Sequence, residues 1–283
     1  MSGIDNGADG RGKPDLKLSR RSMVAAGALL ATLGGGVFAK KARAAGPPNE
    51  GPVHGASYGL YCKTASPSDP ACLCFLSSTR LKTPSGEAAI ETLSIGDLVT
   101  NKNGEARAIR WVGRITVDGD GDAPWRSDAM PIRVSKDAFG NGTPHRDLYL
   151  SRSHMVHLNG VLIPVGDLIN GRTIAAVDLP GDQLVYYHIE LETHDVVIAE
   201  GAPCETLLTS EEKIAAFDNA DEYHALYGVP ADMAAYAPLA AFVGGRSELK
   251  SRLRSAIAVV VDMRDRRDVA RDSIESRAFD KAA

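Results

Sequence analysis

The chain has 283 residues, a formal net charge of -4 and a pI near 6.0. This length allows one or two domains with a substantial hydrophobic core. The slightly acidic balance gives no reason to expect nucleic acid as a partner, and the basic residues near the N-terminus have another explanation.

The first 45 residues have the features of an export signal. Arg20 and Arg21 precede an apolar run rich in Ala and Gly at 23–39, and Ala42-Arg43-Ala44 is a small-x-small cleavage site. The run is short and its glycines make it a poor membrane-spanning helix. The paired arginines resemble a twin-arginine signal. We therefore expect export to the periplasm or the cell exterior, with the twin-arginine machinery as a partner and no stable membrane span in the mature chain.

Residues 46–71 form a lead segment rich in Gly, Pro and Ser, without aliphatic periodicity. In an oxidising compartment the four cysteines, Cys62, Cys72, Cys74 and Cys204, can form disulfides, and four cysteines allow three connectivities. A Cys62–Cys72 disulfide would leave Cys74 free, whereas a Cys72–Cys74 bridge would be strained. The cysteines alone leave these alternatives open.

Residues 74–99 read CFLSSTRLKTPSGEAAIETLSIGDLV: a cysteine, an apolar residue, a short loop, and a TPSGE turn before a second apolar run. This stretch resembles the first block of a Hint module, the fold shared by inteins and the autoprocessing part of Hedgehog-type proteins. The resemblance implies that Cys74 is a nucleophile aimed at the peptide bond after Leu73, so the chain would be its own substrate. Thr79 would be a supporting residue, in a loop where Ser78-Thr79 replaces the usual Gly-Thr.

Between residues 72 and 208, short apolar runs alternate with turn signals, which predicts a mainly β domain. Asn-Gly pairs at 103–104 and 159–160 indicate tight hairpins, because they supply the positive φ that such turns need. No βαβ rhythm is present, which argues for an all-β arrangement. The resemblance implies a horseshoe-like Hint fold of short strands and hairpins, followed by a helical C-terminal tail. The predicted strands are 89–93, 97–100, 109–117, 132–134, 148–151, 155–158, 161–165, 174–177, 185–191 and 195–200.

A second block, RDLYLSRSHMV, spans residues 146–156. Hint proteins carry a Thr-x-x-His element here, and this chain has Ser151-x-x-His154 followed by an apolar strand. The resemblance implies that His154 protonates the departing amide nitrogen, while a hydroxyl such as that of Ser151 and backbone N–H groups stabilise the oxyanion. Asp147 is a supporting residue of this block. The alternative is that His154 is an ordinary buried strand histidine.

A third block, VYYHIELETHDVV, spans residues 185–197 and is similar to the C-terminal block of inteins. On that match His188 replaces a frequent Asp, and His194 is the histidine of the block. Asp195 either orients a neighbouring imidazole or is a turn residue. In the alternative, His188 lies on the solvated face of a hairpin and His194 caps its turn.

The chain lacks the terminal Asn that splicing requires, since residues 199–206 read AEGAPCET. The blocks look most like those of bacterial Hint-type autoprocessing proteins, which implies an N–S acyl shift without full splicing. Cys74 would form a thioester with the chain's own N-terminal segment, resolved by water or another nucleophile. No cofactor and no metal is expected for this reaction.

Three other functions compete with this one. The domain could be an inactive Hint-fold scaffold or binding module, or a Cys–His hydrolase acting in trans with His154 or His194 as base. A metal site could be built from His154, His157, His188 and His194. Two of these, His154 and His157, are three apart on a predicted strand and so should face opposite sides.

Residues 209–283 form a helical extension by composition, since Glu, Ala, Lys and Arg recur at helical spacing. Ser210 starts one predicted helix, and a longer helix is predicted from 247 to about 269. The basic residues of the tail alternate with acids, which predicts a solvated helix face with Arg252, Arg254, Arg264, Arg266 and Arg267. The residues expected to pack the tail onto the β domain are Tyr223, Tyr227, Met233, Tyr236, Leu239 and Phe242.

Overall fold

The structure is a computed structural model that describes residues 74–119, 129–231, 233–241, 245–258 and 261–280. The predicted export signal, the lead segment, Leu73 and the suggested Cys62–Cys72 disulfide lie outside the described residues, as does Phe242. In the part of the chain that is described, no helix combines the length and apolar character needed to cross a bilayer.

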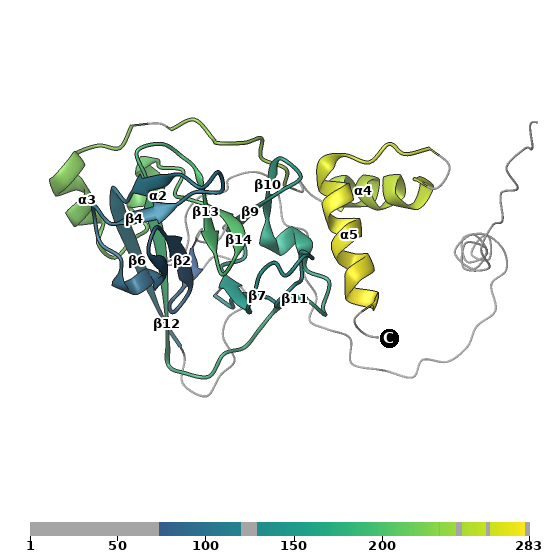
Figure 1. Cartoon of the computed structure of the whole chain (residues 1–283), viewed down its shortest axis with the longest axis horizontal. Coiled ribbons are helices and arrows are strands. Elements are labelled where there is room, and N and C mark those ends of the chain that lie inside the picture. Colours follow the sequence, from purple (N-terminus) through teal and green to yellow (C-terminus); the bar gives the residue numbers. More distant parts are fainter. Residues whose placement is uncertain (1–73, 120–128, 232, 242–244, 259–260, 281–283) are drawn as a thin grey trace, which may run out of the picture. The chain divides into compact units, whose positions relative to one another are not determined.

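The described chain is mainly β, as predicted (Figure 1). Short strands follow one another from residue 75 to residue 205, and helices follow from residue 211 onward. The strands are β1 (Phe75–Leu76), β2 (Arg80–Thr83), β3 (Gly86–Ala89), β4 (Leu98–Thr100), β5 (Ala106–Ala108), β6 (Trp111–Asp118), β7 (Ile132–Val134), β8 (Leu148–Leu150), β9 (Met155–Leu158), β10 (Val161–Pro164), β11 (Ile174–Ala176), β12 (Gln183–Glu190), β13 (Val196–Ala199) and β14 (Ala202–Glu205).

Two six-stranded sheets and one short ribbon make up the β part. The first sheet has the order β11-β7-β8-β1-β12-β6, and the second has the order β10-β9-β14-β13-β2-β3. The ribbon pairs β4 with β5, and every pair of named strands is antiparallel. β1 lies in the middle of the first sheet, between β8 and β12, so the residue just before it is surrounded by strands from distant parts of the sequence.

Most predicted strands are found within two residues of their expected bounds, and both Asn-Gly hairpins are confirmed. In the β9–β10 turn, Asn159 and Gly160 have φ of 50° and 78°, the left-handed pair that a tight hairpin needs. The strand predicted at 89–93 is wrong: β3 ends at Ala89, and a 3-10 helix, η1 (Ile90–Thr92), follows. This turn is stabilised locally, because the Thr92 hydroxyl donates to the Ala89 carbonyl at 2.7 Å.

The helical region differs from its prediction in one respect. Ser210 caps α2 (Glu211–Ile214) as expected, and α3 (Ala220–Tyr227) follows. The single helix predicted from 247 to about 269 is wrong, because α4 (Gly245–Ile257) and α5 (Arg266–Asp280) are separate helices. The break has a local cause: Asp265 accepts a hydrogen bond from the Asp268 N–H at 2.9 Å, and Asp268 accepts one from the Asp265 N–H at 3.2 Å. This reciprocal cap starts a new helix.

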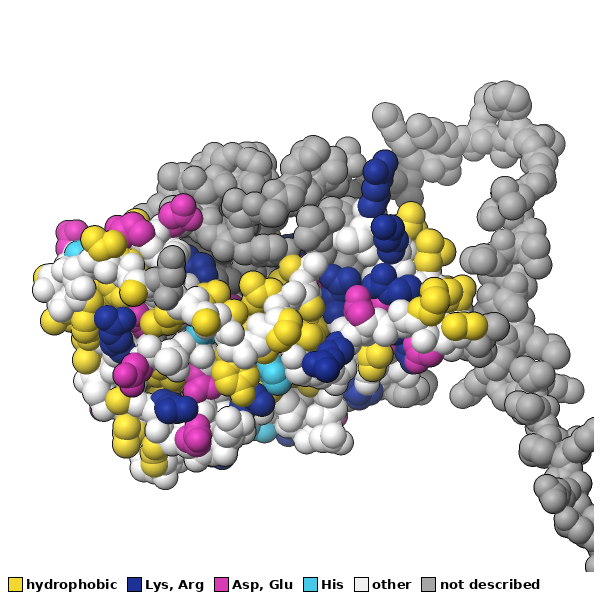
Figure 2. Space-filling model, turned by 90° about the horizontal axis from the view of Figure 1, so that it is seen from above, with side chains coloured by type: hydrophobic (Ala, Val, Ile, Leu, Met, Phe, Trp, Pro, Cys, Tyr) yellow, Lys and Arg dark blue, Asp and Glu magenta, His cyan; other side chains and the backbone are white. Residues whose placement is uncertain are grey.

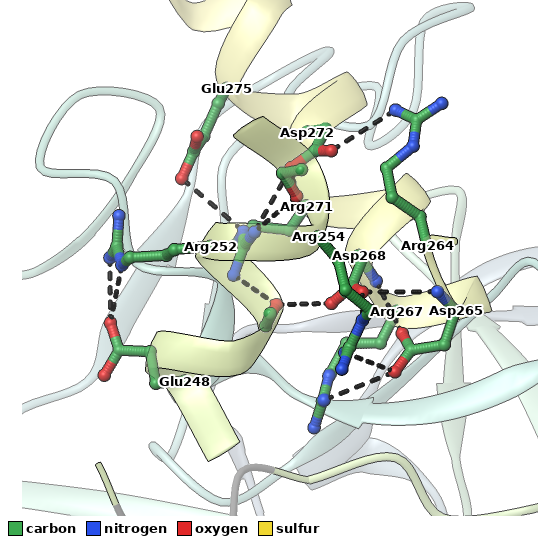
Figure 3. A network of polar contacts seen from close by, with 12 residues as sticks. Glu248, Arg252, Arg254, Arg264, Asp265, Arg267, Asp268, Arg271, Asp272 and Glu275 are labelled. Carbon is green, nitrogen blue, oxygen red and sulfur yellow. Dashed lines mark hydrogen bonds and ion pairs between the residues drawn. The ribbon is translucent and has the colours of Figure 1, made fainter. Parts of the chain in front are cut away.

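Charged residues of α4 and α5 hold these two helices together, as Figure 3 shows. The Arg254 Nε lies 2.5 Å from an oxygen of Asp268, which is buried and also accepts from the Ser251 hydroxyl. Arg271 donates to the Ser251 hydroxyl at 2.7 Å. Arg267 and Arg271 are also buried. The predicted solvated face is therefore wrong for Arg267, which is buried, whereas Arg252 and Arg266 are exposed as predicted.

α2, α3 and their connection cover one face of the first sheet. Ile214, Phe217 and Tyr223 are buried in one cluster with Trp111 and Cys74. Phe217 and Tyr223 each contact the Trp111 ring edge-on, with centroids 5.1 Å apart. The prediction that Tyr223 packs the tail onto the β domain is confirmed, whereas Leu239 remains about half exposed.

The outer surface seen in Figure 2 shows hydrophobic, basic and acidic side chains interspersed. Among the described residues, exposed hydrophobic side chains recur on α4, at Leu249, Leu253 and Ile257. They alternate there with charged residues, which is normal for a surface helix.

Candidate functional site

Cys74 lies directly before β1, is fully buried and is held by its backbone. Its N–H donates to the Ser151 hydroxyl at 2.8 Å, and its carbonyl accepts from the Ser151 N–H at 2.9 Å. Cys74 and Ser151 thus extend the β1–β8 pairing by one position beyond Phe75 and Leu150. Because β1 also pairs with β12, through Phe75 opposite Tyr187, the same continuation places His188 opposite Cys74. Residues directly opposite in an antiparallel pair project from the same face.

Two buried histidines lie beside β1. The ring centroids of His154 and His188 are 5.0 Å apart, and the Phe75 ring lies 4.2 Å from His154 and 5.8 Å from His188. His154 precedes β9, in the turn where its N–H donates to the Ser151 carbonyl. None of the four ring nitrogens of these histidines has a hydrogen-bond partner among the described residues. Such buried and unpaired polar atoms are uncommon in folded proteins and need an explanation.

The environment keeps both imidazoles and the thiol neutral. Burial, together with the charge that His194 would carry, lowers the pKa of His154 to about 3. Burial likewise lowers the pKa of His188 well below its usual range, with a further contribution from His154. Burial and the nearby Glu205 carboxylate raise the pKa of the Cys74 thiol well above its usual range. At neutral pH the site therefore contains a neutral thiol and two neutral imidazoles, and burial makes both imidazoles weak bases.

His194 is held from two sides. Its Nδ1 accepts a hydrogen bond from the Tyr236 N–H at 2.9 Å, and its Nε2 lies 3.4 Å from a carboxylate oxygen of Glu205. Both side chains are buried. The other Glu205 oxygen accepts from the Met155 N–H at 3.0 Å, directly after His154 in the chain. His194 is therefore linked to the His154 turn through Glu205. The alternative that put His188 on the solvated face of a hairpin does not hold, because His188 is fully buried.

The three residues predicted as supporting make other contacts. The Thr79 hydroxyl donates to the Leu76 carbonyl at 2.7 Å, which closes the loop after β1. Asp147 is exposed and accepts from the Lys136 N–H at 2.8 Å. The carboxylate of Asp195 accepts from Asn101 and lies 3.4 Å from Arg107. Among the described residues no imidazole contacts Asp195, so it anchors the β4–β5 ribbon instead of orienting a histidine.

Two functional candidates were missed from the sequence. Glu205 is the last residue of β14 and is buried, but strand alternation puts it on the face opposite Ala202 and Cys204, so no local pattern marks it. Lys213, in α2, donates to the Leu208 carbonyl at 2.6 Å. Burial lowers the pKa of Lys213, while Glu205 acts in the opposite direction.

One group in the described residues could hold a metal ion by spacing alone. Potential ligand atoms of Glu87, His145 and Glu200 lie within 4.8 Å of one another. Arginines already neutralise this group, since the Arg146 Nε lies 3.1 Å from Glu200 and the Arg80 Nε lies 3.8 Å from Glu87. None of the histidines considered for a metal site in the sequence belongs to it. The group is accounted for as an ion-pair network.

Comparison with known proteins identifies the β part of the chain. Residues 73–211 match the family model described as the Hint domain. This segment is thus similar to the Hint domain, and the predicted mainly β fold class with a helical C-terminal region is confirmed. The match begins one residue before Cys74 and ends at the first residue of α2.

Several solved structures are similar to part of the chain. They include the MchDnaB-1 intein, with 16% identity, 46% of this chain and 98% of that chain covered, and a TM-score of 0.34. A bacterial intein-like domain from Clostridium thermocellum has 12% identity, with 48% and 100% coverage and a TM-score of 0.35. The Msm DnaB1 intein splicing domain bound with zinc has 15% identity, with 46% and 98% coverage and a TM-score of 0.33. A search of curated proteins gave no match.

Proposed function

We propose that this Hint domain processes its own chain, with Cys74 attacking the carbonyl carbon of Leu73. The observation that carries the proposal is the hydrogen bond from the Cys74 N–H to the Ser151 hydroxyl, beside two buried imidazoles without hydrogen bonds. The nitrogen of this N–H is the leaving group of the reaction. Groups that exchange protons are therefore gathered where a proton must be delivered.

The reaction balances as an acyl shift. The Cys74 sulfur bonds to the Leu73 carbonyl carbon, the bond from that carbon to the Cys74 nitrogen breaks, and the thiol proton ends on the freed amine. In this scheme the neutral His154 imidazole receives the thiol proton, and the Ser151 hydroxyl, which accepts from the Cys74 N–H, lies at the nitrogen that must gain one. Water or another nucleophile then releases the N-terminal segment as an acid or an acyl derivative and restores the thiol.

Burial of Cys74 favours a substrate in the same chain over one supplied from outside. The Leu73–Cys74 peptide bond adjoins the nucleophile, so no cleft for a separate substrate is required. The reacting atoms belong to one molecule. Full splicing is not part of the proposal, because residues 199–206 offer no Asn to cyclise. The export of the chain, from its Arg20-Arg21 signal, is a second part of the proposal and rests on the sequence alone.

The test compares the full chain with two single variants, produced under reducing conditions. Wild type should give a product that begins at Cys74, and Cys74→Ala should remain at full length in intact mass spectra. Cys204→Ala is the matched control, because Cys204 is the other free cysteine of the described residues and is equally buried. It should cleave like wild type. A single unchanged mass for all three proteins would refute the proposal and favour an inactive scaffold.

A further inference from the structure

A segment outside the Hint match lies against the site. Residues 233–241, which we call the C-terminal strap, follow α3 and run along β10. The Leu162 N–H donates to the Pro238 carbonyl at 2.9 Å, and the Ala240 N–H donates to the Leu162 carbonyl at 2.8 Å. The strap therefore forms a parallel β-bridge with β10. This strand is at the edge of its sheet, where backbone groups can pair with another segment.

Side chains also fix the strap to the Hint domain. Tyr236 and the neighbouring Ala237 pack against a buried cluster of Met155, Leu162 and Val196. The Tyr236 ring meets His157 edge-on at 5.9 Å, and the Lys102 Nζ lies 5.4 Å from its centroid. At its far end the strap is tied to α5, because Arg267 donates to the Ala241 carbonyl at 2.8 Å.

The strap supplies one polar contact to the site, from the Tyr236 N–H to the His194 Nδ1. An N–H donor occupies the lone pair of Nδ1, so the ring proton of neutral His194 must be on Nε2. His194 Nε2 lies 3.4 Å from a Glu205 carboxylate oxygen, close enough for the N–H dipole to act on that charge, although the two atoms make no hydrogen bond. In the other tautomer the Nε2 lone pair would face this carboxylate, which would repel it in a buried site.

We propose that the C-terminal strap is a positioning part of the Cys74 site, acting through Tyr236, His194 and Glu205. The Tyr236 N–H holds His194 in the Nε2–H tautomer. His194 then stabilises the Glu205 carboxylate, and Glu205 holds the Met155 N–H and with it the turn from Ser151 to His154. The inference rests on the proposed self-processing, and it assigns a role to residues beyond the Hint match. His194 and Glu205 are positioning residues here, since the contacts of His194 are to Tyr236 and Glu205.

The first test removes only the strap's donor. Tyr236→Pro lacks the N–H, whereas Tyr236→Phe keeps the N–H and loses only the hydroxyl. Ala235→Pro is the matched control, because Ala235 is exposed and its N–H makes no hydrogen bond among the described residues. In metal sites, loss of an outer contact that orients a histidine typically changes activity by about 10- to 100-fold, and a similar size is expected here. Tyr236→Pro should therefore slow cleavage after Leu73 by about tenfold or more, and the two controls should stay near the wild-type rate.

The second readout is the ring of His194 itself, observed by long-range proton–nitrogen correlation NMR on the Cys74→Ala background. His194 should be the Nε2–H tautomer in the parent and in Ala235→Pro, and a mixture of tautomers in Tyr236→Pro. Should Tyr236→Pro not fold, as judged by circular dichroism, Ala240→Pro frees the strap at its bridge to Leu162 and should shift the tautomer in the same direction.

The outcomes separate this inference from the proposed function. Cleavage of Tyr236→Pro at the wild-type rate would overturn the positioning role, and so would an Nδ1–H tautomer in the parent protein. If no protein cleaves, the self-processing proposal fails. The NMR result then still decides whether the strap sets the tautomer of His194.

Discussion

Acid sensitivity of folding is a direct consequence of the buried histidine pair. His154 and His188 are fully buried, and the pKa of each is lowered in the folded protein, to about 3 for His154. In the unfolded chain a histidine has a pKa of about 6.5. Between pH 6.5 and about pH 3 the unfolded state therefore binds protons that the folded state does not. The free energy of unfolding must fall as the pH falls through this range.

The size of the effect follows from the same linkage. One pH unit below the unfolded pKa costs about 1.4 kcal/mol for each histidine that stays neutral when folded. Lowering the pH from 7.5 to 5.5 should thus remove about 3 kcal/mol for the pair, a large part of a typical stability of about 5–15 kcal/mol. Above pH 7 the two residues should contribute almost no pH dependence.

Urea unfolding at a series of pH values measures this loss. The Cys74→Ala protein is the parent, so that cleavage does not interfere. The double variant His154→Gln, His188→Gln should lose about 3 kcal/mol less than the parent between pH 7.5 and 5.5. His224→Gln, on the more exposed α3, is the control and should keep the parent's slope. Equal losses in the parent and the double variant would refute the reasoning.

Three further predictions concern other parts of the chain. Ser151→Ala removes the hydroxyl that accepts the nucleophile's N–H and should slow cleavage by about 10², whereas Ser151→Thr should retain most of the rate; time courses of intact mass decide between them, and an unchanged rate in Ser151→Ala would exclude this hydroxyl from the reaction. Gly113→Ala should lower the free energy of unfolding by about 1–3 kcal/mol, because an added Cβ would lie 2.5 Å from the Phe217 ring; equal urea midpoints would contradict this packing. Arg20→Lys with Arg21→Lys should leave the chain inside the cell in fractionation experiments, and continued export would argue against a twin-arginine signal.

The sequence predicted those features that depend on local pattern. Alternating apolar residues and Asn-Gly turns located most strands, and the Cys74, Ser151 and His154 blocks predicted residues that do lie together. The two residues of β1 could not be recognised as a strand, because their order comes from pairing with β8 and β12, which are far away in sequence. Nothing local indicates such a pairing.

The rest of the site depends on tertiary contacts in the same way. Glu205 was not predicted, since its role comes from facing His194 and the Met155 N–H across strands β14 and β9. For the strap, the sequence predicted only that its side chains pack onto the β domain. The contact of the Tyr236 N–H with His194 was not predicted, because a backbone N–H leaves no pattern in the sequence. The break between α4 and α5 was missed although Asp265 carries a recognisable cap signal.

The central claim is that the Cys74 sulfur takes the acyl group of Leu73. The most direct measurement is treatment of the reduced full chain with hydroxylamine, followed by mass spectrometry of the released N-terminal fragment. Wild type should give a fragment that ends in a Leu73 hydroxamate and a partner that begins with a free Cys74 amine, and Cys74→Ala should give neither. A chain that stays intact in hydroxylamine, or is cut at any other bond, would contradict this claim.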